Sequence, residues 1–294
     1  MADNQKQTVQ WFPGHMAKTR RLIKESLSLV DGVTELLDAR IPMSSRNPEL
    51  DELTGRKPRI VLLNKCDVAD DRITKEWIEY FREKGQYALA VDCRTGKGLN
   101  QYHNLVRQVL ADRIKANEER GMPGKALRIM VVGIPNTGKS SFINRMAGKN
   151  RAKVADKPGV TRHNQWFAIG NGIELLDTPG VLWPKFDDPE VGDRLSFIGS
   201  VKDEVTDVET MAVRLIEVLA RDYSDKLTGR YKLNGIADLS QAMPWELLEE
   251  IGRERGMLIR GGEVNTERAS VMLLDEYRGG KMGKISFERP SQYK

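Results

Sequence analysis

The residues with the clearest chemical purpose form a glycine-rich run from Gly133 to Ser140 with the pattern G-x-x-x-x-G-K-S. Glycines let the backbone fold tightly enough for its N–H groups to point at phosphate oxygens, and a helix N-terminus favours anions. Lys139 can reach the β and γ phosphates of a nucleotide, and the Ser140 hydroxyl can ligate Mg²⁺. The run predicts a P-loop, with nucleotide contacts from Asn136, Thr137, Gly138, Lys139, Ser140 and Ser141.

A second motif, Asn64-Lys65-Cys66-Asp67, follows an apolar run and predicts which base is bound. An ionised Asp67 carboxylate only accepts hydrogen bonds, so it suits guanine N1–H and the 2-amino group, whereas adenine presents the wrong pattern. Alone, N-K-x-D is equally typical of a polar turn, but beside a P-loop it indicates guanine. We therefore expect Asn64, Lys65 and Asp67 to bind the nucleotide.

The stretch from Asp92 to Gly98 occupies the place of a second base-contacting loop, although it lacks the common Ser-Ala pair. Its backbone is expected to contact the guanine oxygen, which adds Asp92, Cys93 and Arg94 to the nucleotide-binding residues.

Two further segments predict contacts with the γ phosphate and its metal ion. The D-x-x-G sequence from Asp177 to Gly180 places a carboxylate near Mg²⁺ and a glycine N–H near the γ phosphate. Thr161 lies between the P-loop and Asp177, where a switch threonine closes over the metal, although a lone loop threonine is usually just solvated. We expect Ser140, Thr161 and Asp177 to hold Mg²⁺, and Lys139, Thr161 and Gly180 to take part in phosphoryl transfer.

The order of these motifs is rotated relative to an ordinary GTPase, because the base-reading motifs precede the phosphate motifs. Domain termini often lie close together, so joining the old ends and cutting elsewhere preserves a fold. The polar stretch from Asn117 to Lys125 would be that join. The new cut falls after Asp177, so whatever follows is attached directly to the segment that senses the γ phosphate.

Hydrophobic periodicity predicts the elements that position these motifs. Apolar runs predict strands at 33–38, 59–63, 87–91, 127–132 and 173–176, and helical spacing predicts helices at 19–29, 74–84 and 99–116. After about residue 207 the pattern is only helical, at 208–220, 244–255 and 267–278. The prediction is an α/β domain with a parallel sheet covered on both faces, over residues 1–190, followed by an all-helical domain over 191–294.

Composition sets wider limits. The 294 residues are 30% charged and 39% hydrophobic, and no apolar run approaches the ~20 residues that cross a bilayer. The N-terminus lacks a secretory signal, and the two cysteines, Cys66 and Cys93, lack metal-binding spacing, which predicts reduced thiols in the cytoplasm. The net charge of +5 suits an RNA-facing protein without demonstrating one.

With these motifs, three more segments carry a resemblance to a known family: Trp11-Phe12-Pro13-Gly14-His15-Met16, Asp38-Ala39-Arg40-Ile41-Pro42 and Pro158-Gly159-Val160-Thr161. Over nearly its whole length the chain resembles the circularly permuted GTPases, specifically the ribosome biogenesis GTPase A family. The resemblance implies a Ras-like P-loop GTPase domain, circularly permuted, with a C-terminal helical RNA-binding domain. It also implies GTP hydrolysis with Mg²⁺, coupled to a late step in assembly of the large ribosomal subunit and stimulated by its precursor, through rRNA and ribosomal proteins. We expect a monomer.

Two site residues follow from departures and matches within that resemblance. Ras-like enzymes generally orient the attacking water with a glutamine after D-x-x-G, but this chain has Val181 and Leu182 there. His15 is the candidate to replace that glutamine, a role that the resemblance favours; capping the next helix or contacting RNA are equal alternatives. Asn136 matches related GTPases that bind K⁺ beside the phosphates, and an ordinary P-loop asparagine is the alternative.

Basic side chains indicate where RNA would bind, although solvated helix faces have the same composition. The candidates are Arg20, Arg21 and Lys24 near the N-terminus, and Arg253, Arg255, Arg260, Lys281 and Lys284 near the C-terminus. The primary hypothesis is an assembly GTPase in which GTP fixes the switches and hydrolysis releases the particle. The alternative is an RNA-binding scaffold with regulatory, slowly hydrolysed GTP. A metabolic P-loop kinase is disfavoured by the guanine motif and by the lack of an acceptor lid.

Overall fold

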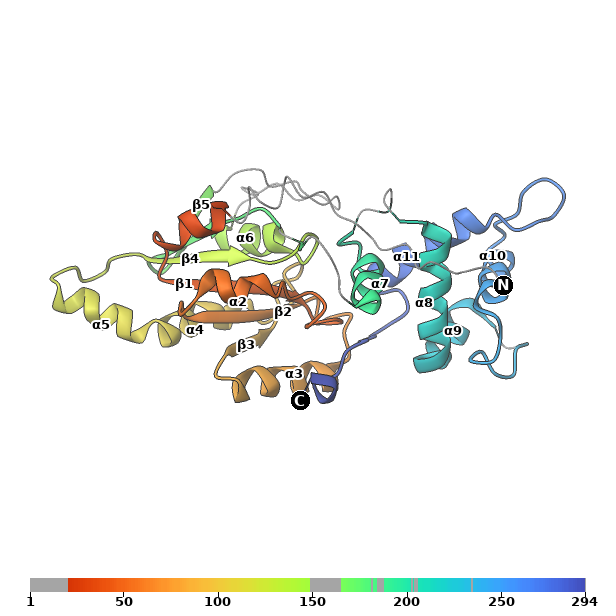
Figure 1. Cartoon of the computed structure of the whole chain (residues 1–294), viewed down its shortest axis with the longest axis horizontal. Helices are drawn as coiled ribbons and strands as arrows, with labels where there is room; N and C mark the ends of the chain where they lie inside the picture. Colours follow the sequence, from red (N-terminus) through yellow and green to blue (C-terminus); the bar gives the residue numbers. More distant parts are fainter. Residues whose placement is uncertain are drawn as a thin grey trace. The chain divides into compact units, whose positions relative to one another are not determined.

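The computed structural model describes residues 21–148, 165–180, 182–183, 188–201, 203, 206–233 and 235–293. The chain divides into two compact units. Of the described residues, 21–183 and 286–293 form the first, which we term the sheet unit, and 188–285 form the second, the helical unit (Figure 1).

A six-stranded sheet forms the centre of the sheet unit. Its strands are β1 (Gly32–Asp38), β2 (Arg59–Asn64), β3 (Tyr87–Ala90), β4 (Leu127–Val132), β5 (Gln165–Gly170) and β6 (Ile173–Asp177). Their order is β3-β2-β1-β4-β6-β5, and every described pairing is parallel except that of β5 with β6. The strand before the P-loop, β4, therefore lies in the middle beside β1, as a permuted Ras-like domain requires.

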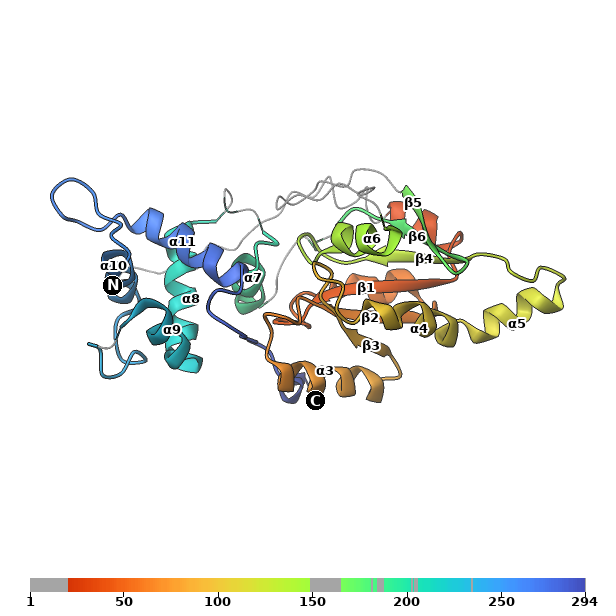
Figure 2. The same cartoon turned by 180° about the vertical axis from the view of Figure 1, so that it is seen from behind.

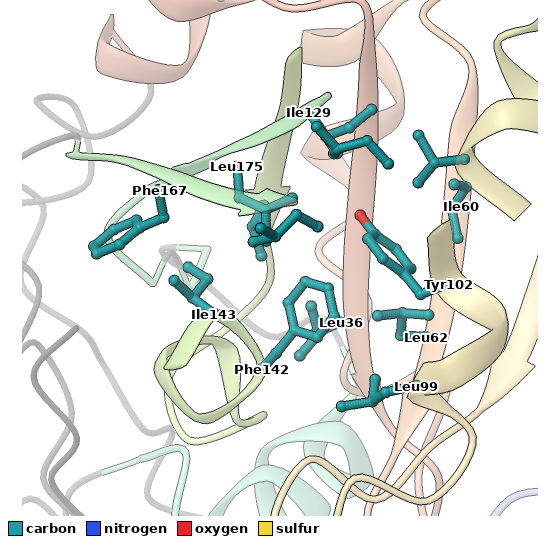
Figure 3. Packing of buried hydrophobic residues seen from close by; sticks show 14 of the residues in the cluster. Leu36, Ile60, Leu62, Leu99, Tyr102, Ile129, Phe142, Ile143, Phe167 and Leu175 are labelled. Carbon is teal, nitrogen blue, oxygen red and sulfur yellow. The ribbon is translucent and has the colours of Figure 1, made fainter. Parts of the chain in front are cut away.

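Alternating side chains of the central strands build a core on each face of the sheet. On one face Leu36 and Leu62 pack with Tyr102 and Phe142, which belong to α4 (Tyr102–Val109) and α6 (Lys139–Ala147) (Figure 3). The opposite face is covered by α3 (Asp71–Glu83), by α2 (Glu49–Thr54) and by a helix at 21–27. Both faces are thus buried, which explains why the strands are nearly continuous apolar runs.

The single long helix expected at 99–116 is wrong, because the structure breaks it. A 3₁₀ turn, η1 (Leu99–Gln101), precedes α4, and α5 (Ala111–Glu119) begins after Leu110, whose φ of −105° and ψ of 21° interrupt the helix. The side chains of α4 pack on the sheet, whereas Asn117 is the only buried residue of α5, which extends beyond the strands in both views (Figure 2). The expected join at 117–125 consequently starts inside α5.

The edge strand β5 was not predicted, and its antiparallel pairing departs from the expected parallel sheet. A tight turn joins it to β6 through Asn171 and Gly172, with φ values of 50° and 69°. An Asn-Gly pair with positive φ at both positions is typical of a two-residue hairpin. That dipeptide was the available signal for the missing strand.

The described residues of the helical unit form five α-helices: α7 (Pro189–Phe197), α8 (Val208–Asp222), α9 (Ser224–Tyr231), α10 (Pro244–Glu254) and α11 (Thr266–Arg278). Of these, α7 and α9 were not predicted. The longest, α8, contacts all four others and buries Leu215, Ile216 and Leu219 among them. None of the described helices is long and apolar enough to cross a membrane.

The last residues of the chain lie on the sheet unit, so a helical domain running to 294 is wrong at its end. Residues 286–293, which we term the C-terminal segment, include the 3₁₀ turn η3 (Pro290–Tyr293) and pack on α3. The Tyr293 ring lies 5.7 Å from that of Trp77, whose indole N–H donates to the Glu288 carbonyl oxygen at 3.2 Å. An aromatic contact and a buried hydrogen bond therefore hold this end against the sheet unit.

One charged cluster ties the helices of the helical unit together. The largely buried Glu276 carboxylate of α11 accepts hydrogen bonds from Arg230 Nε and Tyr231 Oη of α9, both at 2.9 Å. Arg255, beyond α10, lies 3.6 Å from the same carboxylate. The Arg230 hydrogen bond, with further help from Tyr231 and Arg255, lowers the pKa of Glu276 against the opposing effect of burial.

Replacing Glu276 with glutamine should lower the free energy of unfolding of the helical unit by about 2 kcal/mol at pH 7, because hydrogen bonds to a charged partner are lost. The folded pKa lies below the ordinary 4.5, so the contribution of the carboxylate is present above pH 4.5 and disappears as the pH falls through the folded value. Urea unfolding of both proteins at several pH values measures the difference. The exposed Glu254→Gln serves as control, and a gap that persists undiminished at pH 2 would contradict the assignment.

Candidate nucleotide site

All the predicted site motifs that the structure describes lie at one edge of the sheet, where the parallel strands end. The P-loop follows β4, Asn64 ends β2, the Asp92 loop follows β3, and Asp177 ends β6. Carboxyl ends of parallel strands meet at one edge, which is where open α/β sheets bind ligands. The fold therefore brings motifs that lie far apart in the sequence, and in rotated order, to one edge of the sheet.

The P-loop backbone has the form of a phosphate cradle. Gly138 precedes α6 with φ of 96°, and a Cβ atom there would lie 2.3 Å from Asn64 Nδ2. At Gly133 a Cβ would lie 2.6 Å from the Leu36 carbonyl oxygen. Gly138, at the N-cap of α6, has no side chain that could accept from the first N–H groups of the helix, which suits these groups to binding an anion. Only glycine fits these two positions.

Lys139 is buried within this cradle. Its Nζ donates to the carbonyl oxygens of Gly133 and Ile134 at 2.9 and 3.1 Å. Burial lowers the pKa of Lys139 to about 8, against the opposing charge of Asp177. A Cβ atom at Gly180 would lie 3.0 Å from the same Nζ, so the D-x-x-G segment lies directly against the P-loop lysine. Phosphate oxygens could therefore replace the two carbonyl oxygens as hydrogen-bond acceptors of the Lys139 ammonium group.

The Asn64 side chain joins the phosphate loop to both base loops. Its Nδ2 donates to the Thr137 carbonyl oxygen at 2.7 Å, and its Oδ1 accepts from the Cys93 backbone N–H at 2.9 Å. Asn64 is buried, so both hydrogen bonds form away from water and resist exchange. The structure thus brings the expected P-loop, base motif and second base loop together around one amide.

The Asp67 carboxylate, which is predicted to bind the base, has a partner within the chain. Arg94 Nη2 donates to Asp67 Oδ2 at 3.0 Å, and the Arg94 side chain is otherwise largely exposed. The Asp92 carboxylate shapes its own loop, because it accepts hydrogen bonds from the backbone N–H of Arg94 and from the Thr95 hydroxyl. Cys66 and Cys93 are both buried, and burial raises the pKa of the Cys93 thiol.

One part of the site had no assigned role in the sequence. Asp38, at the end of β1, is fully buried and receives Arg40 Nε at 2.9 Å and Arg40 Nη2 at 2.8 Å, while Lys65 Nζ lies 3.0 Å away. Although burial raises it, the Arg40 and Lys65 charges hold the pKa of Asp38 well below its usual range. The sequence did contain a signal for this role of Asp38: a carboxylate ends an apolar strand, and an arginine follows two residues later.

The donors that Mg²⁺ needs are present at the phosphate end. Ser140 lies in the first turn of α6, and Asp177 is buried at the end of β6. Mg²⁺ commonly takes one or two protein oxygens together with substrate phosphates, which fits this donor set. Ser141 follows on α6, and Asn136 occupies the P-loop with φ of 62°. His15, Thr161 and Val181 lie outside the described residues.

Comparisons with known proteins agree with this geometry. Residues 128–232 match the family described as 50S ribosome-binding GTPase. Ribosome biogenesis GTPase A from Bacillus cereus is 45% identical over 285 residues, covering 97% of this chain and 95% of that protein. The protein of the same name from Priestia megaterium is 47% identical, covering 97% and 98%, and that from Thermotoga maritima is 35% identical, covering 96% and 95%.

Two solved structures are also similar to this chain over nearly its whole length. A GDP-bound YlqF has a TM-score of 0.67 and 31% identity, covering 92% of this chain and all of that one. The GNP-bound YlqF from T. maritima has a TM-score of 0.66 and 32% identity, covering 93% and 98%. The likeness extends over both units.

Replacing Asp67 with asparagine should move base preference from guanine toward xanthine by at least about tenfold, because the amide offers a donor where guanine needs an acceptor. Competition calorimetry with GTP and xanthosine triphosphate measures the ratio of dissociation constants. The exposed Glu83→Gln at the end of α3 is the matched control. Undiminished guanine preference in Asp67→Asn would show that the base binds elsewhere.

Proposed function

The chain belongs to the ribosome biogenesis GTPase A family, and we propose that it binds the precursor of the large ribosomal subunit and couples GTP hydrolysis to a late step of its assembly. The observation that supports the proposal most directly is that the chain runs from the D-x-x-G segment into the helical unit. The helical unit begins with α7 at Pro189, shortly after the D-x-x-G segment that ends at Gly180. Loss of the γ phosphate would therefore act first on the segment that leads into the helical unit.

Hydrolysis of GTP depends mainly on positioning and charge stabilisation. In our proposal the α6 N-terminus, Lys139 and the Gly180 N–H hold the β and γ phosphates, while Asp67 holds the guanine. Ser140, Asp177 and Thr161 would hold Mg²⁺, which when bound offsets the negative charge of the phosphates. Two observations support this arrangement: Lys139 is buried within the P-loop, and the D-x-x-G segment lies directly against it.

The attacking water needs a polar partner, and the residue after D-x-x-G does not supply one. Val181 and Leu182 occupy the places after Gly180, and the Leu182 side chain is buried. An imidazole near neutral pH can orient or deprotonate a water. We therefore assign this role to His15.

Several exposed residues of the helical unit suit contact with RNA. Trp245 and Met243 at the start of α10 are 50% and 60% exposed, and Ile259 lies beside the exposed Arg260. Exposed aromatic and arginine side chains stack on unpaired bases and neutralise phosphates. Some of the expected RNA contacts have partners within the chain: Arg21 pairs with Glu25, Arg253 pairs with Glu250, and Arg255 approaches Glu276. Arg260 and Lys281 are exposed and are the better candidates.

We propose that the protein acts as a monomer in the cytoplasm, where rRNA and ribosomal proteins of the large-subunit precursor are its partners. The compact helical unit and the buried sheet core support a chain that folds without a second copy.

GTP turnover should rise well above its slow intrinsic rate when purified large-subunit particles are added, and His15→Ala should lower the stimulated rate by about 100-fold. Phosphate release with and without particles measures both effects. His103→Gln is the control, since His103 contacts the Ile169 carbonyl oxygen on the sheet and should leave turnover unchanged. Equal rates with and without particles would favour a scaffold whose GTP is regulatory.

We further propose that Asn136 helps to hold K⁺ beside the phosphates, where a cation offsets charge on the leaving oxygens. Turnover in K⁺ should then exceed turnover in Na⁺ at equal ionic strength. Asn136→Gly should remove the difference while tolerating the left-handed φ of 62° at this position. Equal rates in the two salts for the unaltered protein would remove K⁺ from the mechanism.

A further inference from the structure

The C-terminal segment contacts the sheet unit through a carboxylate with several donors around it. Glu288 is fully buried, and its carboxylate accepts the backbone N–H of Met43 at 2.7 Å and that of Ser44 at 2.9 Å. It also accepts the Ser44 hydroxyl, and the Tyr293 hydroxyl at 3.1 Å. A buried carboxylate with such partners fixes the backbone that it binds, since releasing it would leave polar groups unpaired.

Main-chain hydrogen bonds hold the same segment at two more places. The Phe287 N–H donates to the Arg40 carbonyl oxygen at 2.9 Å, and the Ser286 hydroxyl accepts the Asp70 N–H at 3.0 Å. Asp70 caps the start of α3, which follows the guanine motif along the chain. The C-terminal segment therefore contacts both the 38–45 loop, which follows β1, and the far end of the loop that carries Asp67.

The 38–45 loop leads from this segment to the guanine motif. Its Ala39 N–H donates to the Asn64 carbonyl oxygen at 2.8 Å, and its Ser45 hydroxyl accepts the Asp38 N–H at 3.0 Å. Arg40 binds both oxygens of the Asp38 carboxylate, and Lys65 Nζ lies 3.0 Å from Oδ2, which also accepts from Arg40 Nη2. The place of the Lys65 side chain thus depends on a loop whose backbone Glu288 holds.

Lys65 needs such support because of its backbone. Its φ is 61°, in the left-handed region that a side chain disfavours. A residue held in that region persists when surrounding contacts over-determine it. The ion pair with Asp38 and the hydrogen bond from Ala39 to Asn64 are contacts of that kind.

We propose that Glu288 is a positioning residue for the guanine site, through which the C-terminal segment holds the 38–45 loop and so the place of Lys65. The proposal rests on Asn64 to Asp67 being the base site, as proposed above. It makes the end of the chain a determinant of nucleotide affinity, although Glu288 touches no part of the nucleotide.

Glu288→Gln keeps the shape of the side chain and removes its charge. Calorimetry of the full chain should show dissociation constants for GTP and GDP that both rise by about tenfold, because the change lies at the purine end and both nucleotides share it. The fraction of protein that binds and the single-turnover rate of bound GTP should stay unchanged. A purely structural defect would instead lower the binding fraction or the single-turnover rate, and would overturn the proposal.

A double-mutant cycle tests the route through Lys65. In a Lys65→Ala background, Glu288→Gln should weaken GTP binding by less than about twofold, since the interaction it supports is already gone. A full additional loss in that background would overturn the route. Ser44→Ala removes one partner of Glu288 with a smaller change and should weaken both nucleotides in the same direction. If Glu288→Gln does not fold, unchanged binding in Ser44→Ala overturns the proposal.

Two control variants separate the position of Glu288 from its charge. Arg289→Gln alters the exposed neighbour in the same segment, and Glu263→Gln makes the same chemical change at an exposed site of the helical unit. Both should bind GTP as the unaltered protein does, and a loss in either overturns the assignment to Glu288. Asp67→Asn in the same assay separates a failure of the proposed base site from a failure of the proposed role of Glu288. If Asp67→Asn leaves guanine preference intact, the base site is misplaced, whatever Glu288→Gln does.

Discussion

The amide of Asn64 is the contact on which the nucleotide site depends. It donates to the P-loop and accepts from the loop after β3, so one buried side chain sets the separation between the loops that we propose hold the two ends of a nucleotide. An amide suits this place because it offers a donor and an acceptor in one plane. The roles proposed for Lys139, the D-x-x-G segment and Asp67 require that separation.

Rotation of the motif order is tolerated because the sheet, and not the chain order, places the loops. Each loop leaves the carboxyl end of its own strand, and β1 pairs in parallel with β2 on one side and β4 on the other. Strand register is set by side chains buried on both faces, so it does not depend on which segment is made first. What changes is the location of the chain ends, and with it the element that follows the D-x-x-G segment, which we propose senses the γ phosphate.

Most of the sheet and the nucleotide loops could be predicted, since strands buried on both faces are apolar runs and P-loop chemistry restricts residue types. The break at Leu110 could not be predicted, because α4 and α5 share one helical periodicity in the sequence. The two helices differ in their packing, since α4 lies on the sheet and α5 extends beyond it. Within the site, the role of Asp38 depends on Arg40 and Lys65 meeting in space. Glu288 was missed because nothing in its local sequence indicates a partner some 240 residues earlier.

Residues 286–293 make the helical unit an insertion within the sheet unit, since its described residues, 188–285, stand in the sequence between the two described parts of the sheet unit, 21–183 and 286–293. Ending translation at Trp183 would therefore strip α3 of its aromatic cover at Tyr293 and the 38–45 loop of its carboxylate partner. Excising 188–285 and bridging the gap with a flexible linker would keep both. Activity lost by simple truncation therefore says nothing about the helices until the bridged form has been compared with it.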